Sequence, residues 1–338
     1  MLTEKENLLM TLRGEVPEWV PRNMYPSPGH PPASAGCGPS FLNARRTPQG
    51  GFDIWGVEFV TTKDTGGMAI PKPGKFILDD ITKWRDVIKA PDISDIDWET
   101  MAKKDLARID RSQTAVSAMV HVGYFQSLCN FMGFNEGLMA MIEEPEEVYE
   151  LFEYMSSFWV QICSKIRDYY KPDIWGVTDD TATATNPFIS PETYRNLVKP
   201  FHKREAAFGV EMGIPVDMHN CGRCEDFVQD WVDIGITAWD PAQTDNDLLG
   251  IKEKFGRKML IVGGWDYSGP VSHPGSSDQL LKDELVKYVD TMAPGGGFAY
   301  FTRFLGKTGD PEAARKMKIM NDFYYDYARD WYKRNGYV

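Results

Sequence analysis

The residues with the clearest chemical potential lie in the segment VDMHNCGRCEDF, where His219 and Cys221 stand two positions apart. Imidazole and thiolate are two of the ligands that zinc prefers in proteins. The same pair also fits a capping histidine beside a buried thiol, and Cys224 fits either a third ligand or a half-buried helix cysteine. We predict a metal site with His219 and Cys221 as ligands.

Two adjacent carboxylates, Asp179 and Asp180, form a second candidate site. Neighbouring acids cannot both be buried and ionised without a cation or strong hydrogen-bond donors. Either one aspartate faces the site while the other caps a turn, or both serve the site. We predict catalytic roles for Asp179, Asp180 and Gln243, and Gln243 follows the strand candidate that contains Asp240.

These residues need a scaffold that gathers them, and the second part of the chain predicts one. From about residue 114, short apolar runs alternate with longer amphipathic segments; the runs are AVSAMVHV, PDIWGVT, IPVDMH, GITAWD, MLIVGG and GGFAYF. This alternation implies parallel strands joined by right-handed crossovers. No GxGxxG follows the first run, so a closed (β/α) barrel is favoured over an open dinucleotide-binding sheet.

In a parallel barrel the functional residues lie at the carboxyl ends of the strands. Six strand candidates in this chain end in polar or metal-binding residues: His121, Asp179 with Asp180, His219 with Cys221, Asp240 with Gln243, Asp266, and Arg303. We expect these ends to form one cleft.

We predict one domain over residues 1–338, with an N-terminal extension and active-site loop at 1–110 and the main barrel at 110–338. Residues 17–51 are dense in Pro and Gly, yet they also carry large apolar side chains, which favours an ordered loop over a flexible linker. FDIWGVEFV indicates a strand or hairpin arm. Its letters DIWGV recur at 173–177, which we interpret as two similar strands.

Composition narrows the class of protein. The 338 residues carry a net charge of −12, which argues against a nucleic-acid or anionic membrane partner. No apolar run reaches the roughly 18 residues that span a bilayer, and no secretory signal is recognisable, so we expect a cytoplasmic protein. The five scattered cysteines do not suggest a disulfide framework. Cys37 and Cys129 therefore remain alternatives for a further metal ligand.

Four segments closely resemble the uroporphyrinogen decarboxylase superfamily. They are DDTATATNPFISPETYRNLVKPFHKREAAF, IPVDMHNCG, WDPAQTDNDLLGIKEKFG and LIVGGWD, and the resemblance covers roughly residues 110–330. It implies an α/β fold, a distorted (β/α)8 TIM barrel with its cleft at the carboxyl ends of the strands.

The resemblance points to the corrinoid-dependent methyltransferase branch. True decarboxylases hold a polyanionic porphyrinogen with an arginine-rich N-terminal motif, whereas the corresponding loop here, PRNMYPSPGH, has a single arginine. The coenzyme M members of the methyltransferase branch bind zinc through His-x-Cys and a later cysteine. His219 and Cys221 match the first two positions, but PGGGFAYFTRF lacks the later cysteine.

Fewer thiolates make a more electrophilic zinc, which suits cleavage of a methyl ether. We therefore expect zinc, completed by Asp180 or another oxygen ligand, and transfer of a methyl group from a methoxylated, aromatic small molecule. The acceptor is cobalamin on a small corrinoid protein, and a homodimer is left open as the oligomeric state. The expected substrate-binding residues are Asn23, Met24, Tyr25, His121, Gln126, Trp265 and Arg303.

Two alternatives stay open. One is metal-free decarboxylation of a smaller acid, with Asp179 or Asp180 stabilising a protonated intermediate. The other is a non-catalytic accessory protein that binds a corrinoid or another ligand. Of the remaining residues, we assign His202 and His273 to the surface and Cys163 to the core.

Overall fold

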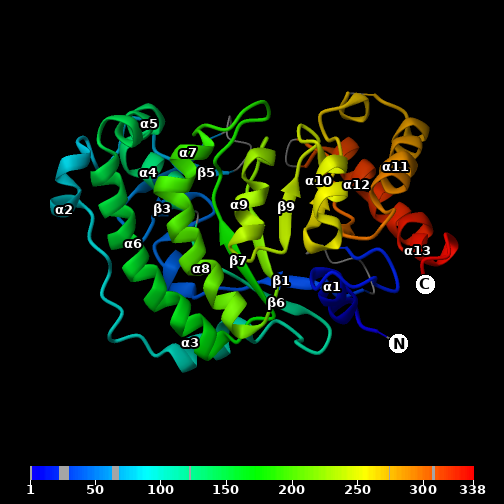
Figure 1. Cartoon of the computed structure of the whole chain (residues 1–338), viewed down its shortest axis with the longest axis horizontal. Coiled ribbons are helices and arrows are strands. Elements are labelled where there is room, and N and C mark those ends of the chain that lie inside the picture. Colours follow the sequence, from blue (N-terminus) through cyan, green and yellow to red (C-terminus); the bar gives the residue numbers. More distant parts are fainter. Residues whose placement is uncertain (1, 23–29, 63–67, 122, 274, 307–308) are drawn as a thin grey trace.

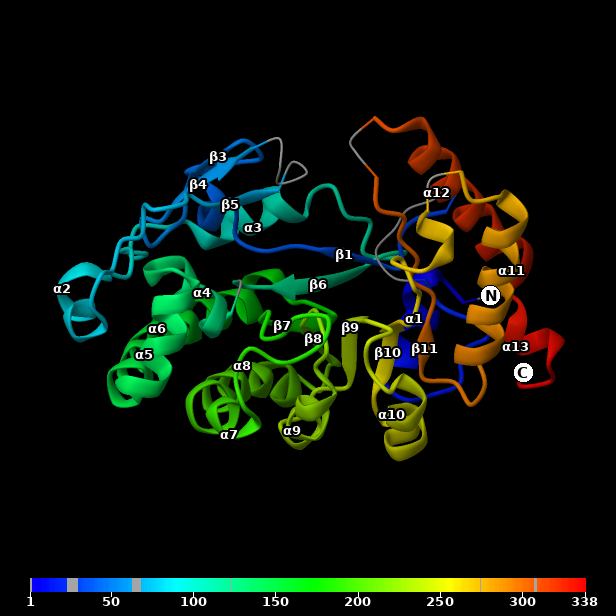
Figure 2. The same cartoon turned by 90° about the horizontal axis from the view of Figure 1, so that it is seen from above.

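The structure is a computed structural model that describes residues 2–22, 30–62, 68–121, 123–273, 275–306 and 309–338. Its centre is a curled sheet of seven strands in which all neighbouring pairs are parallel. Figure 2 shows the strands following one another around an arc. In spatial order they are β1 (Ser34–Gly36), β6 (Ala115–Met119), β7 (Ile174–Thr178), β8 (Val216–His219), β9 (Ala238–Ala242), β10 (Leu260–Gly263) and β11 (Phe298–Ala299).

A short segment before β1 takes the next position beyond β11. The backbone N–H of Tyr300 donates to the carbonyl of Pro21 at 2.8 Å, and Arg22 forms a parallel bridge with Tyr300. A bridge in place of a full strand makes this side of the barrel irregular. The fold is therefore the predicted distorted (β/α)8-like barrel, and all six predicted strands from AVSAMVHV to GGFAYF are present.

Helices cover the outer face of the sheet (Figure 1). The longest, α6 (Pro145–Lys165), starts with proline at a position where no backbone N–H is needed, and it buries an apolar stripe from Val148 to Ile162. The others around the barrel are α4 (Tyr124–Met132), α5 (Phe134–Glu143), α7 (Pro191–Thr193), α8 (Lys199–Met212), α9 (Val228–Asp233), α10 (Leu248–Phe255) and α11 (Asp278–Met292). Helices α12 (Pro311–Phe323) and α13 (Trp331–Arg334) follow β11.

The amino-terminal end of the barrel is closed by α1 (Glu4–Leu12). A capping box between Thr3 and Glu6 fixes its first turn. Its apolar side chains Leu8 and Leu12 pack against residues from the beginnings of the barrel strands, among them Ala115. Access to the barrel interior is thus left to the opposite, carboxyl end of the strands.

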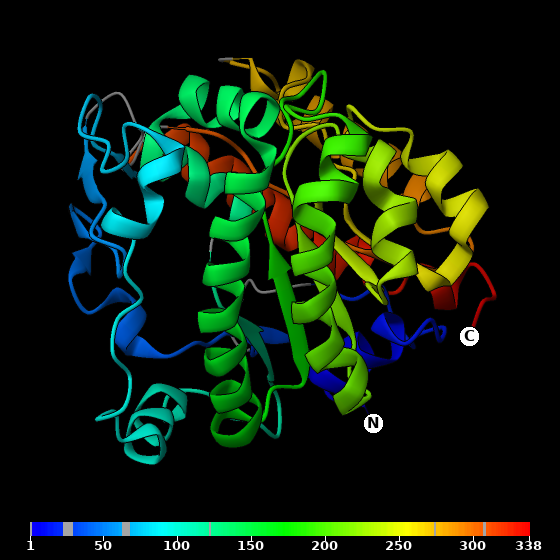
Figure 3. The same cartoon turned by 60° about the vertical axis from the view of Figure 1, so that its left-hand side comes forward.

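The N-terminal extension adds a four-stranded antiparallel sheet beside the barrel (Figure 3). Its strands are β2 (Arg46–Thr47), β3 (Gly50–Phe52), β4 (Glu58–Thr61) and β5 (Ala69–Pro71). FDIWGVEFV is thus a hairpin, as predicted, but the interpretation of the two DIWGV segments as two similar strands is wrong. In the hairpin these letters form the turn, because the Asp53 carboxylate accepts the N–H groups of Trp55 and Val57 at 2.9 Å each.

Two smaller elements complete the chain before β6: α2 (Trp84–Val87) and α3 (Trp98–Leu106). Over the part of the chain that is described, no helix is both long and apolar enough to cross a membrane.

Candidate functional site

The register of three neighbouring strands brings the predicted chemical residues together. Thr178 of β7 pairs with His219 of β8, and His219 pairs with Asp240 of β9. Asp180 and Cys221 lie two residues beyond the first two of these paired positions, at the carboxyl edge. The strand ends therefore converge as the barrel pattern predicts.

Asp180, His219 and Cys221 form a cluster that fits a metal ion. One ligand atom from each lies within 4.8 Å of the others, and all three residues are half-buried. The Cys221 Sγ to His219 Nε2 distance is 3.9 Å, close to the spacing of roughly 3.3–3.8 Å expected between tetrahedral zinc ligands. A thiolate, an imidazole and a carboxylate form a zinc-type donor set with room for a further ligand.

The orientation of the His219 ring is set by Asp240 of the neighbouring strand β9. Its Nδ1 lies 3.0 Å from Oδ1 of Asp240, which leaves Nε2 directed toward Cys221. Burial and the neighbouring Asp240 raise the pKa of Asp217 well above its ordinary value. A carboxylate behind a ligand histidine is the usual outer support of a zinc site.

Positive charge is stabilised in this cluster. Burial opposes protonation of the His219 imidazole, yet the hydrogen bonds with Asp240 and Cys221 prevail and raise the pKa of His219 to about 11. The same partners that hold this proton would stabilise a bound cation in its place.

The loop after β8 is held by backbone contacts. The Cys221 N–H donates to Oδ1 of Asp180 at 3.0 Å. Gly222 follows with a φ of +91°, and a Cβ there would come within 2.5 Å of the Thr183 carbonyl. Because only glycine fits this close approach, the chain can reverse directly after Cys221 and keep its thiol at the mouth.

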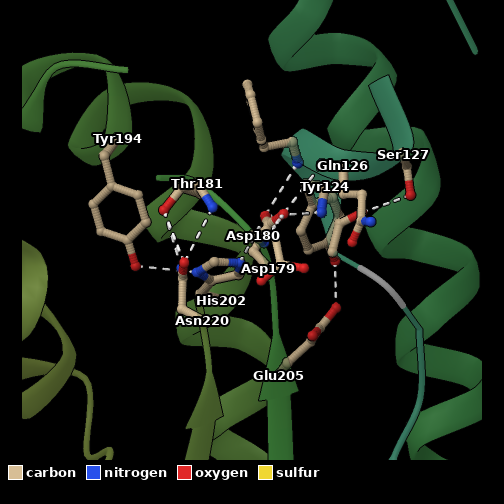
Figure 4. A network of polar contacts seen from close by, with 12 residues as sticks. Tyr124, Gln126, Ser127, Asp179, Asp180, Thr181, Tyr194, His202, Glu205 and Asn220 are labelled. Atoms are coloured by element: carbon tan, nitrogen blue, oxygen red, sulfur yellow. Dashed lines mark hydrogen bonds and ion pairs between the residues drawn. The ribbon is translucent and has the colours of Figure 1, made fainter. Parts of the chain in front are cut away.

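Asp179 has a different environment from Asp180. It is fully buried under the first turn of α4, where its carboxylate accepts the N–H groups of Tyr124, Phe125 and Gln126 at 3.1 Å each. Figure 4 shows these contacts converging on Asp179. Of the alternatives for the aspartate pair, the geometry matches the one in which Asp180 faces the site and Asp179 caps a turn.

The assignment of His202 to the surface is wrong. This residue of α8 is fully buried, with Nε2 3.3 Å from Oδ2 of Asp179 and Nδ1 3.0 Å from the Tyr194 hydroxyl. Beside it, Glu205 Oε1 accepts the Tyr124 hydroxyl at 2.6 Å and contacts His121 Nε2 at 2.6 Å (Figure 4). These residues form one interlocked polar network beneath the strand ends.

More than half of the chain matches a known family. The family model described as uroporphyrinogen decarboxylase (URO-D) matches residues 73–295. The chain belongs to the uroporphyrinogen decarboxylase family.

Two solved structures are similar to this chain to different degrees. A "methyltransferase from Methanosarcina mazei" is 13% identical, with a TM-score of 0.63, and the match covers 96% of this chain and 100% of that one. A "Structure of L-ribulose 3-epimerase" is 12% identical with a TM-score of 0.35, covering 67% of this chain and 73% of the other. Among curated proteins, no sequence matches.

Gln243 joins the metal cluster to a tyrosine that the sequence analysis missed. The Gln243 carbonyl oxygen accepts the Gly222 N–H, and its amide nitrogen donates to the Tyr267 hydroxyl oxygen. Because the backbone N–H fixes which end of the amide is the acceptor, the NH₂ group must face Tyr267. Burial, followed by the nearby Cys221, raises the pKa of Tyr267, so its phenol is protonated at neutral pH.

Two other predicted substrate residues follow β6. His121 uses both ring nitrogens, since Nδ1 accepts the Gly123 N–H at 2.9 Å while Nε2 contacts Glu205. Only its ring face is left for a ligand. Gln126 lies in the first turn of α4, and its backbone N–H is bonded to Asp179.

Trp265 and Arg303 lie near each other in the loops after β10 and β11. The Trp265 indole N–H donates to the Arg303 carbonyl at 3.0 Å, and the Arg303 residue is exposed. Trp265 lines a cavity of 360 Å³ that also involves Leu248 and Tyr288, away from the metal cluster. Asn23, Met24 and Tyr25 lie outside the described residues.

The other cysteines do not belong to the group of possible metal ligands among the described residues, although the Cys224 thiol donates to the Cys221 carbonyl at 3.1 Å. Cys224 is fully buried, with Sγ 3.2 Å from Oδ1 of Asn220, and burial raises the pKa of its thiol. Burial likewise raises the pKa of Cys129 to about 12. Cys37 and Cys163 are buried in the core, and Cys163 was predicted there. Within the described ranges, the group that fits a metal takes its third ligand from Asp180 and not from a cysteine.

Proposed function

We propose that this member of the uroporphyrinogen decarboxylase family is a zinc- and corrinoid-protein-dependent methyltransferase. It takes a methyl group from a methoxylated, aromatic small molecule and passes it to cob(I)alamin on a small partner protein in the cytoplasm. The observation that carries the proposal is the cluster of Asp180, His219 and Cys221 at the barrel mouth. Full-length similarity to the fold of a methyltransferase supports it.

The composition of the cluster decides between the reactions that such a site can serve. One thiolate with an imidazole and a carboxylate makes a harder site than a thiolate-rich shell. A zinc ion held by these residues would polarise an ether oxygen as a Lewis acid and improve it as a leaving group. Asp240 contributes by holding His219 in the orientation that presents Nε2.

Loss of a methyl cation equivalent from an ether leaves an oxyanion that must take up a proton. Tyr267 is placed to supply it. Its oxygen accepts the Gln243 amide N–H, so its own O–H hydrogen is free to point into the mouth. We assign Tyr267 as the proton donor to the leaving oxygen and Gln243 as the residue that positions it.

The test is demethylation of a panel of methoxylated aromatic compounds by the purified chain together with a reduced small corrinoid protein. Formation of the free phenol is followed by chromatography. We expect the wild type to turn over, and both His219→Ala and chelator-treated protein to lose turnover. The exposed His273→Ala variant is the matched control and keeps activity.

Three outcomes would overturn the proposal. Turnover that survives the chelator would show that the reaction does not need a metal ion. Release of CO₂ from an acid substrate assigns the site to decarboxylation instead. Binding of the corrinoid protein with no product from any donor makes the chain an accessory protein.

A further inference from the structure

A second cavity lies apart from the metal cluster, between the antiparallel sheet of the N-terminal extension and the barrel. Its volume is 230 Å³, and its walls come from β2, the β3–β4 turn, the end of β6, α4 and α6. Figure 2 shows β3 and β4 on one side and α4 and α6 on the other. None of Asp180, His219 and Cys221 lines it.

Aromatic side chains form part of the walls of this cavity. Trp55, Phe59 and Trp159 line it, and the His121 ring stacks on Trp159 with a centroid distance of 4.5 Å and an angle of 15°. Trp55 meets Trp159 edge-on at 5.9 Å. Rings fixed in such contacts form flat, rigid walls, and flat walls favour a planar, apolar ligand body.

One cation, Arg46, lines the cavity together with one acid, Asp53. The Arg46 guanidinium lies 3.8 Å from the centroid of the Phe59 ring, a geometry that leaves its N–H edge free. Across the described residues Arg46 takes part in no ion pair or side-chain hydrogen bond. Asp53 interacts electrostatically with Arg46 without forming an ion pair among the described residues, and its Oδ1 accepts the N–H groups of Trp55 and Val57.

A buried amide lines the same cavity. Asn130 of α4 is only 7% exposed, and no hydrogen bond of its side chain is found in the part of the chain that is described. Buried amides are nearly always hydrogen-bonded, because an unsatisfied one costs about 1–3 kcal/mol. An amide that faces a cavity without a protein partner is therefore available for a polar ligand group.

We propose that this cavity is a binding site for a small aromatic carboxylate of the benzoate class. A cavity of about 150 Å³ holds benzene, so 230 Å³ accommodates a ring with a carboxylate. The ring lies between the aromatic walls, the carboxylate accepts the two N–H groups of the Arg46 fork, and Asn130 donates to it or to a ring substituent. This site is independent of the proposed methyl transfer.

The experiment titrates benzoate into the intact protein and follows tryptophan fluorescence, since Trp55 and Trp159 form the walls. Benzamide has the same shape without the charge, and cyclohexanecarboxylate has the charge without the flat ring. We expect saturable binding of benzoate, with each analogue at least about tenfold weaker, which corresponds to roughly 1.4 kcal/mol.

Substitutions inside and outside the cavity test whether benzoate binds at this site. Arg46→Gln and Asn130→Leu should each weaken benzoate binding by about tenfold or more. Arg45→Gln is the matched control, because Arg45 is the exposed neighbour that lies over Phe52 and does not line the cavity. Cys221→Ala should bind benzoate like the wild type, which distinguishes failure here from failure of the proposed function.

Equal binding of benzoate and benzamide would overturn the proposal, and so would unchanged affinity in Arg46→Gln. Absence of saturation below about 1 mM benzoate would also overturn it. If Arg46→Gln does not fold, as judged by circular dichroism, the Asn130→Leu variant and the benzamide comparison decide the question alone.

Discussion

Two polar clusters lie at the strand ends, and they differ in burial and in the kind of groups that they bring together. The buried network around Asp179 directs its groups at one another, and the Asp179 carboxylate receives three backbone N–H groups of α4. The mouth cluster around Asp180 leaves the Cys221 thiol and the His219 Nε2 facing each other at 3.9 Å. A fully buried carboxylate that accepts backbone N–H groups holds the fold together, whereas half-buried ligand-type groups that converge are available to a metal ion.

The largest difference between the two clusters should appear when each of the neighbouring aspartates is replaced separately by alanine. Asp179→Ala should lower the free energy of unfolding by about 3–5 kcal/mol, because it strips α4 of its cap and leaves His202 buried without its acid. Asp180→Ala should change it by less than about 1 kcal/mol. Urea denaturation measures both variants, and equal losses would show that the two clusters do not differ in this way.

The next prediction concerns Tyr267, the proposed proton donor beside the cluster of Asp180, His219 and Cys221. Tyr267→Phe should lower the rate of demethylation by about 100-fold while zinc content stays unchanged. The loss should be larger for donors with a poor leaving oxygen, such as aliphatic ethers, than for aryl ethers that leave as stable phenolates. A uniform loss across the donors would assign Tyr267 a role in binding and not in proton transfer.

The smallest expected effect is a pH dependence of the buried network. Burial tends to raise the pKa of Glu205, but His121 and then Tyr124 prevail and lower it. A lowered pKa means that this carboxylate stabilises the fold above the unfolded value of about 4.3, and that the contribution is lost as the pH falls through the folded value. Glu205→Gln should therefore flatten the acid limb of the stability curve.

The control for that experiment is the exposed Glu192→Gln variant, whose acid limb should match the wild type. A Glu205→Gln curve parallel to the wild type at every pH would contradict the assignment of a stabilising charge to Glu205.

The barrel was predictable because its strands are buried on both faces. Buried parallel strands read as continuous apolar runs, and β7 and β10 are runs without one exposed residue. The helices α4 and α5 were not predicted, since they fill a connection that lacks a clear start signal at Gly123. The two DIWGV segments were predicted to be similar strands, but the conformation of so short a segment depends on its surroundings. In the hairpin, hydrogen bonds to the Asp53 side chain stabilise a turn.

The site was predictable where chemistry and strand ends coincide, as at His219, Cys221 and Asp180. His202 was misplaced because the buried face of α8 includes the polar residues His202 and Glu205, so its sequence shows no clean apolar stripe. Tyr267 carries no pattern of its own, and only the contact with Gln243 reveals it. No rule of spacing would connect residues from two different loops.

The most direct test of the central claim is the zinc content of protein purified without added metal, measured by elemental analysis. Cys221 and Cys224 are three residues apart, and only Cys221 belongs to the mouth cluster. We expect stoichiometric zinc in the wild type and in Cys224→Ala, and its loss in Cys221→Ala. Zinc retained in Cys221→Ala, or lost only in Cys224→Ala, would contradict the account.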